Sequence, residues 1–197
     1  MTFRLLTLLV LLGTIGTSAY FRYRARMSGG HIPRRAEGVP FAALRAVVAL
    51  PLLFAPVLYI VNPDWMRWSS FALPMWLRWV GAGLGLLTIP AAQWVFRSIG
   101  RNVSETVLTK ERHELVTVGP YRWIRHPLYA VGILLFVSIG FMAANWFILA
   151  LAALAAILIR FAVIPVEERE LSQKFGEHYR RYMTRTGRLL PRATRID

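Results

Sequence analysis

The sequence predicts an all-α integral membrane protein with about five transmembrane helices, and two observations support that prediction. First, 56% of the 197 residues are hydrophobic, only 17% are charged and the mean hydropathy is +0.45, a composition that is unusual for a soluble domain. Second, the apolar residues gather in runs of about 20, the length that crosses a bilayer as a helix. We therefore expect a single membrane domain.

Five apolar runs are the candidate spans. They cover residues 3–20, 44–61, 76–96, 128–144 and 146–165. The first run is similar to a signal peptide, but the arginines that follow it directly favour a helix that is retained in the membrane. Only Asn145 separates the fourth run from the fifth, so these two spans are expected to form a tight antiparallel hairpin.

The formal net charge of +14 is distributed unevenly along the chain. Six cations fall in residues 22–45, six in residues 97–125 and eight after Glu167, whereas residues 62–75 hold one. By the positive-inside rule, the N-terminus is expected outside, and the basic connections and C-terminal tail are expected in the cytoplasm. Membrane lipids with anionic headgroups account for this charge better than nucleic acid, which is not an expected partner.

Several classes of chemistry find no support in the residue types present. The chain has no cysteine, which excludes a disulfide, a thiolate metal site and a cysteine nucleophile. Its four histidines lack the spacing of metal ligands, so no metal is expected.

Cations stand directly before the fourth apolar run, in the segment GPYRWIRHPLYAVG at residues 119–132. Pro127 suits the first position of a helix, which places Arg125 and His126 at the positive helix end and Tyr129 in the first turn. Unpaired N–H groups, the helix dipole and these cations would attract an anion such as a carboxylate or phosphate. The alternative is that these side chains are only interfacial anchors at the membrane surface, namely Arg122, Trp123, Arg125 and Tyr129.

An acidic cluster follows the fifth run. Pro165 is expected to end or kink the span, and Glu167, Glu168 and Glu170 come next. Because a tight hairpin returns the other ends of its two helices to the same face, this cluster should meet the arginine–histidine pair. Cations for a carboxylate, acids for an ammonium or ribose hydroxyls, and aromatic faces for a sulfonium suit a small zwitterionic cofactor. Simple ion pairs within the chain are the alternative.

The tail beyond the acids is expected to form one amphipathic helix on the cytoplasmic surface of the membrane. Its apolar residues recur at helical spacing. They are Leu171, Phe175, Tyr179, Tyr182 and Met183.

Two segments resemble a known family. HELVTVGPYRWIRHPLYAVG at residues 113–132 and EERELSQKFGEHYRRYMTRTGRLLP at residues 167–191 are similar to the isoprenylcysteine carboxyl methyltransferases, their short prokaryotic members and the related phospholipid N-methyltransferases. The resemblance implies methyl transfer from S-adenosylmethionine, bound at the cytoplasmic face, to a lipid-like acceptor. It divides the single domain, residues 1–197, into N-terminal spans (1–112) and a cofactor-binding part (113–191).

The resemblance also implies roles for individual residues. Cofactor binding would fall to Tyr121, Arg125, His126, Pro127, Tyr129, Glu167, Glu168 and Tyr179. Substrate binding would fall to Tyr182, Arg185 and Arg188, with Arg185 and Glu168 as catalytic residues. The ending RTGRLLP departs from the eukaryotic pattern, so Arg185 and Arg188 remain alternatives for the substrate-facing arginine, and the count from Tyr182 favours Arg185.

The acceptor decides the mechanism. A carboxylate of the isoprenylcysteine type, on a prenylated or other lipophilic molecule, needs only orientation, which an arginine fork provides. An amine or phenol acceptor would need Glu167, Glu168 or His126 as a base. The alternatives are a methyltransferase for phospholipids or other small lipophilic N or O acceptors, an NADPH-dependent enzyme like the sterol reductases, and a non-enzymatic membrane scaffold.

Overall fold

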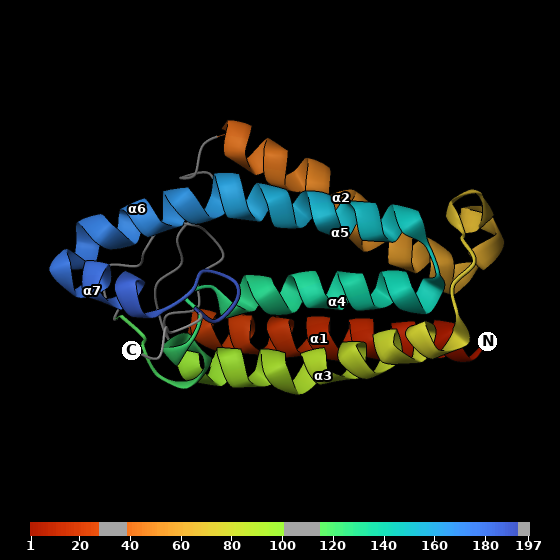
Figure 1. Ribbon diagram of the computed structural model, residues 1–197, viewed down its shortest axis with the longest axis horizontal. Helices are drawn as coiled ribbons and strands as arrows, with labels where there is room; N and C mark the ends of the chain where they lie inside the picture. Colours follow the sequence, from red (N-terminus) through yellow and green to blue (C-terminus); the bar gives the residue numbers. More distant parts are fainter. Residues whose placement is uncertain (28–38, 101–114, 193–197) are drawn as a thin grey trace.

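The computed structural model describes residues 1–27, 39–100 and 115–192, and these residues are built almost entirely from helices. In chain order the elements are α1 (Thr2–Met27), α2 (Val39–Val61), η2 (Pro63–Ser69), α3 (Met75–Ile99), η4 (Gly119–Arg122), α4 (Pro127–Ala143), α5 (Trp146–Leu158), η5 (Ile159–Val163), α6 (Ile164–Phe175) and α7 (Glu177–Arg185). Helices α1 to α5 alternate in direction along the long axis, so α1 begins at the end opposite to α6 and α7 (Figure 1). The all-α prediction is confirmed for the described residues.

Three helical stretches are long and apolar enough to cross a membrane: Thr2–Ala25, Met75–Ile99 and Trp146–Phe175. Two shorter apolar helices, Val47–Val61 and Pro127–Ala143, lie among them. Together they coincide with the five apolar runs of the sequence. The predicted boundary between residues 112 and 113 lies outside the described residues.

The α4–α5 hairpin is confirmed, and Asn145 fixes its turn. Ala144 adopts a left-handed conformation with φ of 48°. The Asn145 side-chain oxygen accepts the Ile148 N–H and so caps α5. Its side-chain nitrogen donates to Ser69 Oγ at 2.7 Å and to the Met66 carbonyl at 3.3 Å. The turn is therefore tied to η2, which connects α2 to α3.

The main core lies in the half of the bundle near this turn. Its buried members come from α1 to α5 and η2, and they are Phe3, Val10, Leu11, Ala55, Tyr59, Met66, Ala82, Leu135, Ile139, Met142, Ala143 and Ile148. The other half contains a much smaller cluster around Ala25, Ala92 and Phe96. Tight packing is thus concentrated at the end of the bundle away from α6 and α7.

Helices α3 and α4 approach each other closely because α3 presents small residues. A Cβ atom added to Gly81 would lie 2.7 Å from Phe141 Cβ and 2.9 Å from the Ser138 carbonyl oxygen, closer than side chains tolerate. A buried contact between the Thr14 and Thr88 hydroxyls, 3.0 Å apart, joins α1 to α3. These contacts fix the helices against which α4 begins.

Pro165 does not end the fifth span, because the helical stretch continues through it to Phe175. Proline lacks an N–H, and its ring collides with the carbonyl four residues earlier in a regular helix. Here a π-helical turn precedes the proline, and the Ile164 N–H donates to the Ile159 carbonyl five residues back. The wider turn accommodates the ring.

The expected single amphipathic tail helix is instead two helices. Gly176 separates α6 from α7 with φ of 53° and ψ of −128°, a conformation that glycine adopts without penalty. The chain therefore turns at Gly176, and α7 returns toward the start of α4 (Figure 1).

Gly81→Val should destabilise the fold by about 1–3 kcal/mol, because the added side chain forces α3 away from α4. Gly83→Val is the matched control, since no atom lies within 4 Å of a Cβ at Gly83. Thermal unfolding in detergent should show a midpoint several degrees lower for Gly81→Val alone. Equal midpoints for the two variants would contradict the close packing of α3 on α4.

Candidate active site

The structure confirms that the arginine–histidine pair and the acidic cluster meet. Arg125 Nε donates to Glu168 Oε1 at 2.8 Å. The two imidazole nitrogens of His126 each lie 3.5 Å from a carboxylate oxygen, Nδ1 from Glu167 Oε2 and Nε2 from Glu168 Oε1. The side chains of Arg125 and Glu168 are only 8% and 7% exposed, so this ion pair is buried. The carboxylates that face the start of α4 in this structure belong to the chain itself.

Local sequence places the cations at this point. As predicted, Pro127 occupies the first turn of α4, and His126 is the N-cap residue. The backbone of His126 is non-helical, with φ of −122° and ψ of 58°, which directs Arg125 and His126 out of the helix and toward α6.

The residues after α7 form a second contact with this junction. The backbone N–H groups of Arg125 and His126 donate to the carbonyls of Gly187 and Arg188 at 2.8 and 3.0 Å, and the Gly187 N–H donates to the Trp123 carbonyl at 3.0 Å. We call residues 186–191 the C-terminal strap. A Cβ on Gly187 would overlap the Leu190 carbonyl, and this glycine is the one sequence signal that marks the strap.

Arg125 also holds the end of α7. Its Nη1 donates to the Met183 carbonyl at 3.1 Å, to the Thr186 carbonyl, and to Thr186 Oγ1 at 3.4 Å. Thr186 is buried, and the sequence analysis did not select it. One guanidinium thus joins the start of α4, the acidic cluster on α6 and the end of α7.

The structure brings one of the two candidate substrate arginines to the cluster. Arg188 Nε and Nη2 both lie 3.0 Å from Glu168 Oε2, and the Arg188 side chain is 35% exposed. Arg185 is the last residue of α7, and its side chain is exposed. Glu168 is therefore shared between Arg125 and Arg188.

Four tyrosines surround this junction. The Tyr182 hydroxyl donates to the Tyr121 carbonyl at 2.7 Å. Burial raises the pKa of Tyr182 to about 12, although Arg125 opposes the rise, so its phenol keeps the proton that it donates. Tyr179 is 1% exposed. The Tyr129 ring is stacked on the His126 ring with centroids 5.8 Å apart.

Three buried side-chain atoms at this junction have no hydrogen-bond partner among the described residues: His126 Nε2, Glu167 Oε2 and the Tyr179 hydroxyl. Leaving a buried polar group unpaired destabilises a fold by about 1–3 kcal/mol. A ligand that offers both donors and acceptors would satisfy these atoms. The donor set therefore fits a zwitterionic cofactor with an ammonium, a carboxylate and ribose hydroxyls.

The carboxylates control the charge of His126. Burial disfavours the imidazolium, but Glu167 and Glu168 outweigh burial and raise the pKa of His126 above its ordinary value. No group of three histidine, aspartate or glutamate side chains in residues 1–27, 39–100 and 115–192 is arranged to hold a metal ion.

Comparison with known proteins places this geometry in a family. The family model for phospholipid methyltransferases matches residues 76–178, more than half of the chain. The chain belongs to the phospholipid methyltransferase family. The match includes α3 except its first residue, the hairpin and the Arg125–Glu168 pair, and it ends before Tyr179 and the strap.

Two proteins with similar sequences have names that refer to different activities. The chain is 34% identical over 118 residues to the cobalt-zinc-cadmium resistance protein CzcN of Cupriavidus metallidurans, an alignment that covers 58% of this chain and 54% of the relative. It is 39% identical over 71 residues to methanethiol S-methyltransferase 1 of Bradyrhizobium diazoefficiens, covering 36% of this chain and 24% of the relative. The chain thus spans about half the length of the first relative and about a quarter of the second.

A solved structure shares the fold of this family member. The eukaryotic intramembrane Ras methyltransferase ICMT, an isoprenylcysteine carboxyl methyltransferase, superposes with a TM-score of 0.57 over 94% of this chain and 67% of that protein, at 21% sequence identity. The resemblance that the sequence motifs predicted is confirmed. The membrane fold of ICMT and the three long apolar helices indicate that the chain is a membrane protein.

The charge of His126 should make stability depend on pH. Because its pKa is raised in the folded state, the stabilisation from protonated His126 is complete below about pH 6.5 and is lost as the pH rises through the folded pKa. The thermal midpoint in detergent should be compared for wild type and His126→Gln between pH 6 and pH 9. We expect the advantage of the wild type to shrink as the pH rises; an advantage that grows would contradict the carboxylate contacts.

Proposed function

We propose that this protein transfers a methyl group from S-adenosylmethionine to a membrane-borne acceptor at the junction of α4, α6 and the strap. The observation that carries the proposal is the set of three unpartnered buried atoms on His126, Glu167 and Tyr179, beside the buried Arg125–Glu168 pair. Membership of the phospholipid methyltransferase family supports the reaction class.

The unpartnered atoms suggest how the cofactor would be held. The Glu167 carboxylate accepts hydrogen bonds from an ammonium or from ribose hydroxyls, and the Tyr179 hydroxyl donates to a carboxylate. The Tyr121 and Tyr129 rings offer aromatic faces to a sulfonium, while Pro127 fixes the start of α4. S-adenosylmethionine carries its methyl group on a positively charged sulfur, which leaves as a neutral thioether. The protein's task is therefore alignment and exclusion of water.

Arg188 is the residue we propose to orient the acceptor. Its Nε and Nη2 atoms bind Glu168, and Nη1 has no partner among the described residues, so one edge of the guanidinium remains for an acceptor carboxylate. A carboxylate oxygen oriented in this way forms the new bond to the methyl carbon as the methyl–sulfur bond breaks, and no proton has to be removed. Arg185, exposed at the end of α7, is the alternative for this role.

One face of α4 offers a route from the bilayer to this site. No described atom lies within 4 Å of a Cβ placed on Gly132, whereas Leu149 of α5 fills that position at Gly140. Tyr129, Gly132 and Ile133 follow i, i+3, i+4 spacing and share a helix face, which ends at Phe136, a residue that packs against the main core. Helix α2 diverges from α4 toward this end (Figure 1). We propose that the apolar chain of a lipophilic or prenylated acceptor lies along this face.

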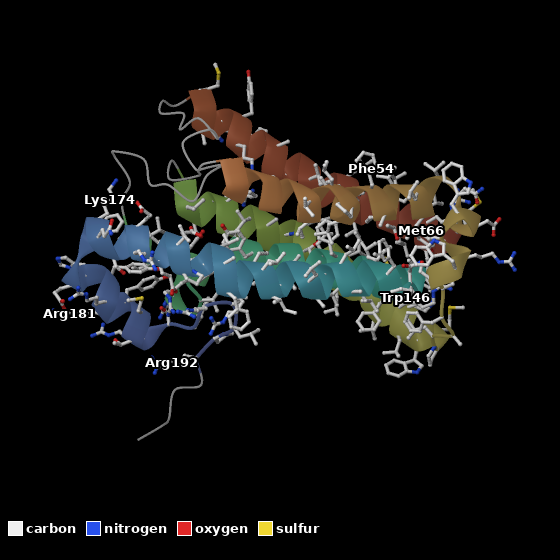
Figure 2. All side chains as sticks on the ribbon, turned by 90° about the horizontal axis from the view of Figure 1, so that it is seen from above. Phe54, Met66, Trp146, Lys174, Arg181 and Arg192 are labelled. Atoms are coloured by element: carbon white, nitrogen blue, oxygen red, sulfur yellow. The ribbon has the colours of Figure 1, made fainter. Side chains whose placement is uncertain are left out.

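The distribution of charge supports a cytoplasmic site. Lys174, Arg181 and Arg192 lie at the α6–α7 end of the molecule, and Met66 and Trp146 lie at the opposite end (Figure 2). By the positive-inside rule, the α6–α7 end faces the cytoplasm, α1 begins outside, and five helices cross the membrane with lipids around them. The contact of α3 with α4 supports one domain across residues 1–197.

S-adenosylhomocysteine should bind to the purified protein, and Glu167→Gln and Tyr179→Phe should each weaken binding about tenfold or more, because each removes an atom that we assign to the cofactor. Glu177→Gln is the control, since this carboxylate is exposed and paired with Arg180. Calorimetry in detergent would measure the three affinities.

The same titration separates the other interpretations. Binding of NADPH but not of S-adenosylhomocysteine would favour a reductase, and binding of neither would favour a scaffold. Unchanged affinity in both Glu167→Gln and Tyr179→Phe would place the cofactor elsewhere.

Gly132→Leu should lower methyl transfer to a long-chain acceptor about tenfold or more while leaving S-adenosylhomocysteine affinity nearly unchanged, because the added side chain occupies the open face of α4. Gly16→Leu on α1 is the control, since its Cβ position is also open. Radiolabelled methyl transfer to N-acetyl-S-farnesylcysteine, phosphatidylethanolamine and methanethiol would identify the acceptor class. Equal loss with methanethiol, which has no long chain, would argue against this route.

A further inference from the structure

We infer that the adjacent acids Glu167 and Glu168 have different roles. Glu168 is a positioning residue that orients Arg188 and holds the C-terminal strap against the start of α4, and Glu167 is the carboxylate of the pair that contacts the ligand. The assignment of a ligand to Glu167 rests on the proposed function. The positioning role of Glu168 rests on contacts within the chain alone.

Both carboxylate oxygens of Glu168 are engaged by guanidinium groups. Oε1 accepts from Arg125 Nε at 2.8 Å, and Oε2 lies 3.0 Å from both Nε and Nη2 of Arg188. The side chain is 7% exposed. A buried carboxylate that two guanidiniums neutralise has little remaining attraction for a cationic ligand, because its charge is already compensated.

Glu167, unlike Glu168, has no guanidinium partner among the described residues. Among the described residues, only His126 approaches its carboxylate at ion-pair distance, at 3.5 Å. Its Oε2 atom is buried without a hydrogen bond, although the side chain as a whole is 27% exposed. Glu167 therefore carries a desolvated carboxylate oxygen without a hydrogen bond on a side chain that is partly exposed, which is the condition of a ligand-binding acceptor.

Glu168 connects three segments that are distant in sequence. Arg125 belongs to the start of α4, Glu168 to α6 and Arg188 to the strap, and the strap also bonds to residues 123–126 through backbone hydrogen bonds. Loss of the Glu168 charge would leave two guanidiniums in a partly buried site without their counter-ion. The strap would loosen, and Arg188 would lose the orientation that we assign to acceptor binding. Glu168 thus acts on the acceptor through Arg188.

Glu167→Gln and Glu168→Gln form a matched pair, because they are neighbouring, isosteric substitutions that each remove one negative charge. Hydrogen exchange in detergent, without any ligand, should be followed for residues 123–126 and 186–191. We expect exchange in both segments to rise about tenfold or more in Glu168→Gln and to remain at the wild-type level in Glu167→Gln. If Glu168→Gln does not fold, Arg188→Gln serves instead and should loosen residues 186–191 while S-adenosylhomocysteine affinity stays within about threefold of wild type.

Kinetics test whether Glu168 acts through Arg188. Glu168→Gln should raise the acceptor KM about tenfold, and adding Arg188→Gln should change it less than twofold further, because the second substitution removes a group that is already misplaced. Glu167→Gln should instead weaken S-adenosylhomocysteine binding. In the double variant of Glu167→Gln and Arg188→Gln, the two losses of methyl-transfer activity should multiply, because the two residues act independently.

Equal strap exchange in Glu167→Gln and Glu168→Gln would overturn the positioning role. Loss of S-adenosylhomocysteine affinity in Glu168→Gln with the strap still protected would overturn it as well, because Glu168 would then contact the ligand directly. A wild-type protein that binds no S-adenosylhomocysteine would refute the proposed function, whereas the exchange comparison would still decide the role of Glu168.

Discussion

The buried ion pair between Arg125 and Glu168 is the interaction on which the polar end of this molecule depends. Removing two charges from water is unfavourable, and the pair persists because nearly every polar atom involved has a partner. Arg125 also bonds to carbonyls at the end of α7, and Glu168 also bonds to Arg188. The pair therefore joins the start of α4 to α6 and to the end of α7, beside the backbone hydrogen bonds that hold the strap to residues 123–126.

The two ends of the α4–α5 hairpin are held by different physical means. At the turn, Asn145 bonds to η2 and the surrounding side chains pack densely. At the other end of the hairpin, where α4 begins and α6 lies, ion pairs and backbone hydrogen bonds hold the segments together. No described atom lies within 4 Å of a Cβ placed on the neighbouring Gly132. Packing of apolar side chains therefore holds the turn end of the hairpin, whereas ion pairs and hydrogen bonds hold its other end.

The sequence was sufficient for features that follow from spacing. A single residue between two apolar runs required a hairpin. The hairpin in turn required Arg125 and the acids to meet, because two antiparallel helices joined by a tight turn have their other ends on the same face. The sequence was insufficient where an unusual backbone conformation determined the path of the chain. The π-turn before Pro165 and the bend at Gly176 leave no periodic signal, and the strap is bonded mainly through its backbone. The contact of Arg188 with Glu168 depends on that strap, so spacing along the chain does not indicate it.

The uninterrupted helix from Trp146 to Phe175 has a mechanical consequence. Glu168 lies about 35 Å along this helix from the Asn145 turn, so a small tilt of the helix about that turn would displace the acids much more than the residues beside the turn. A change in tilt of about 3° would move the acids by about 2 Å relative to a fixed α4, by the geometry of such a rod. Helix tilt responds to bilayer thickness, and the buried Arg125–Glu168 pair is a contact that such a change in tilt would strain.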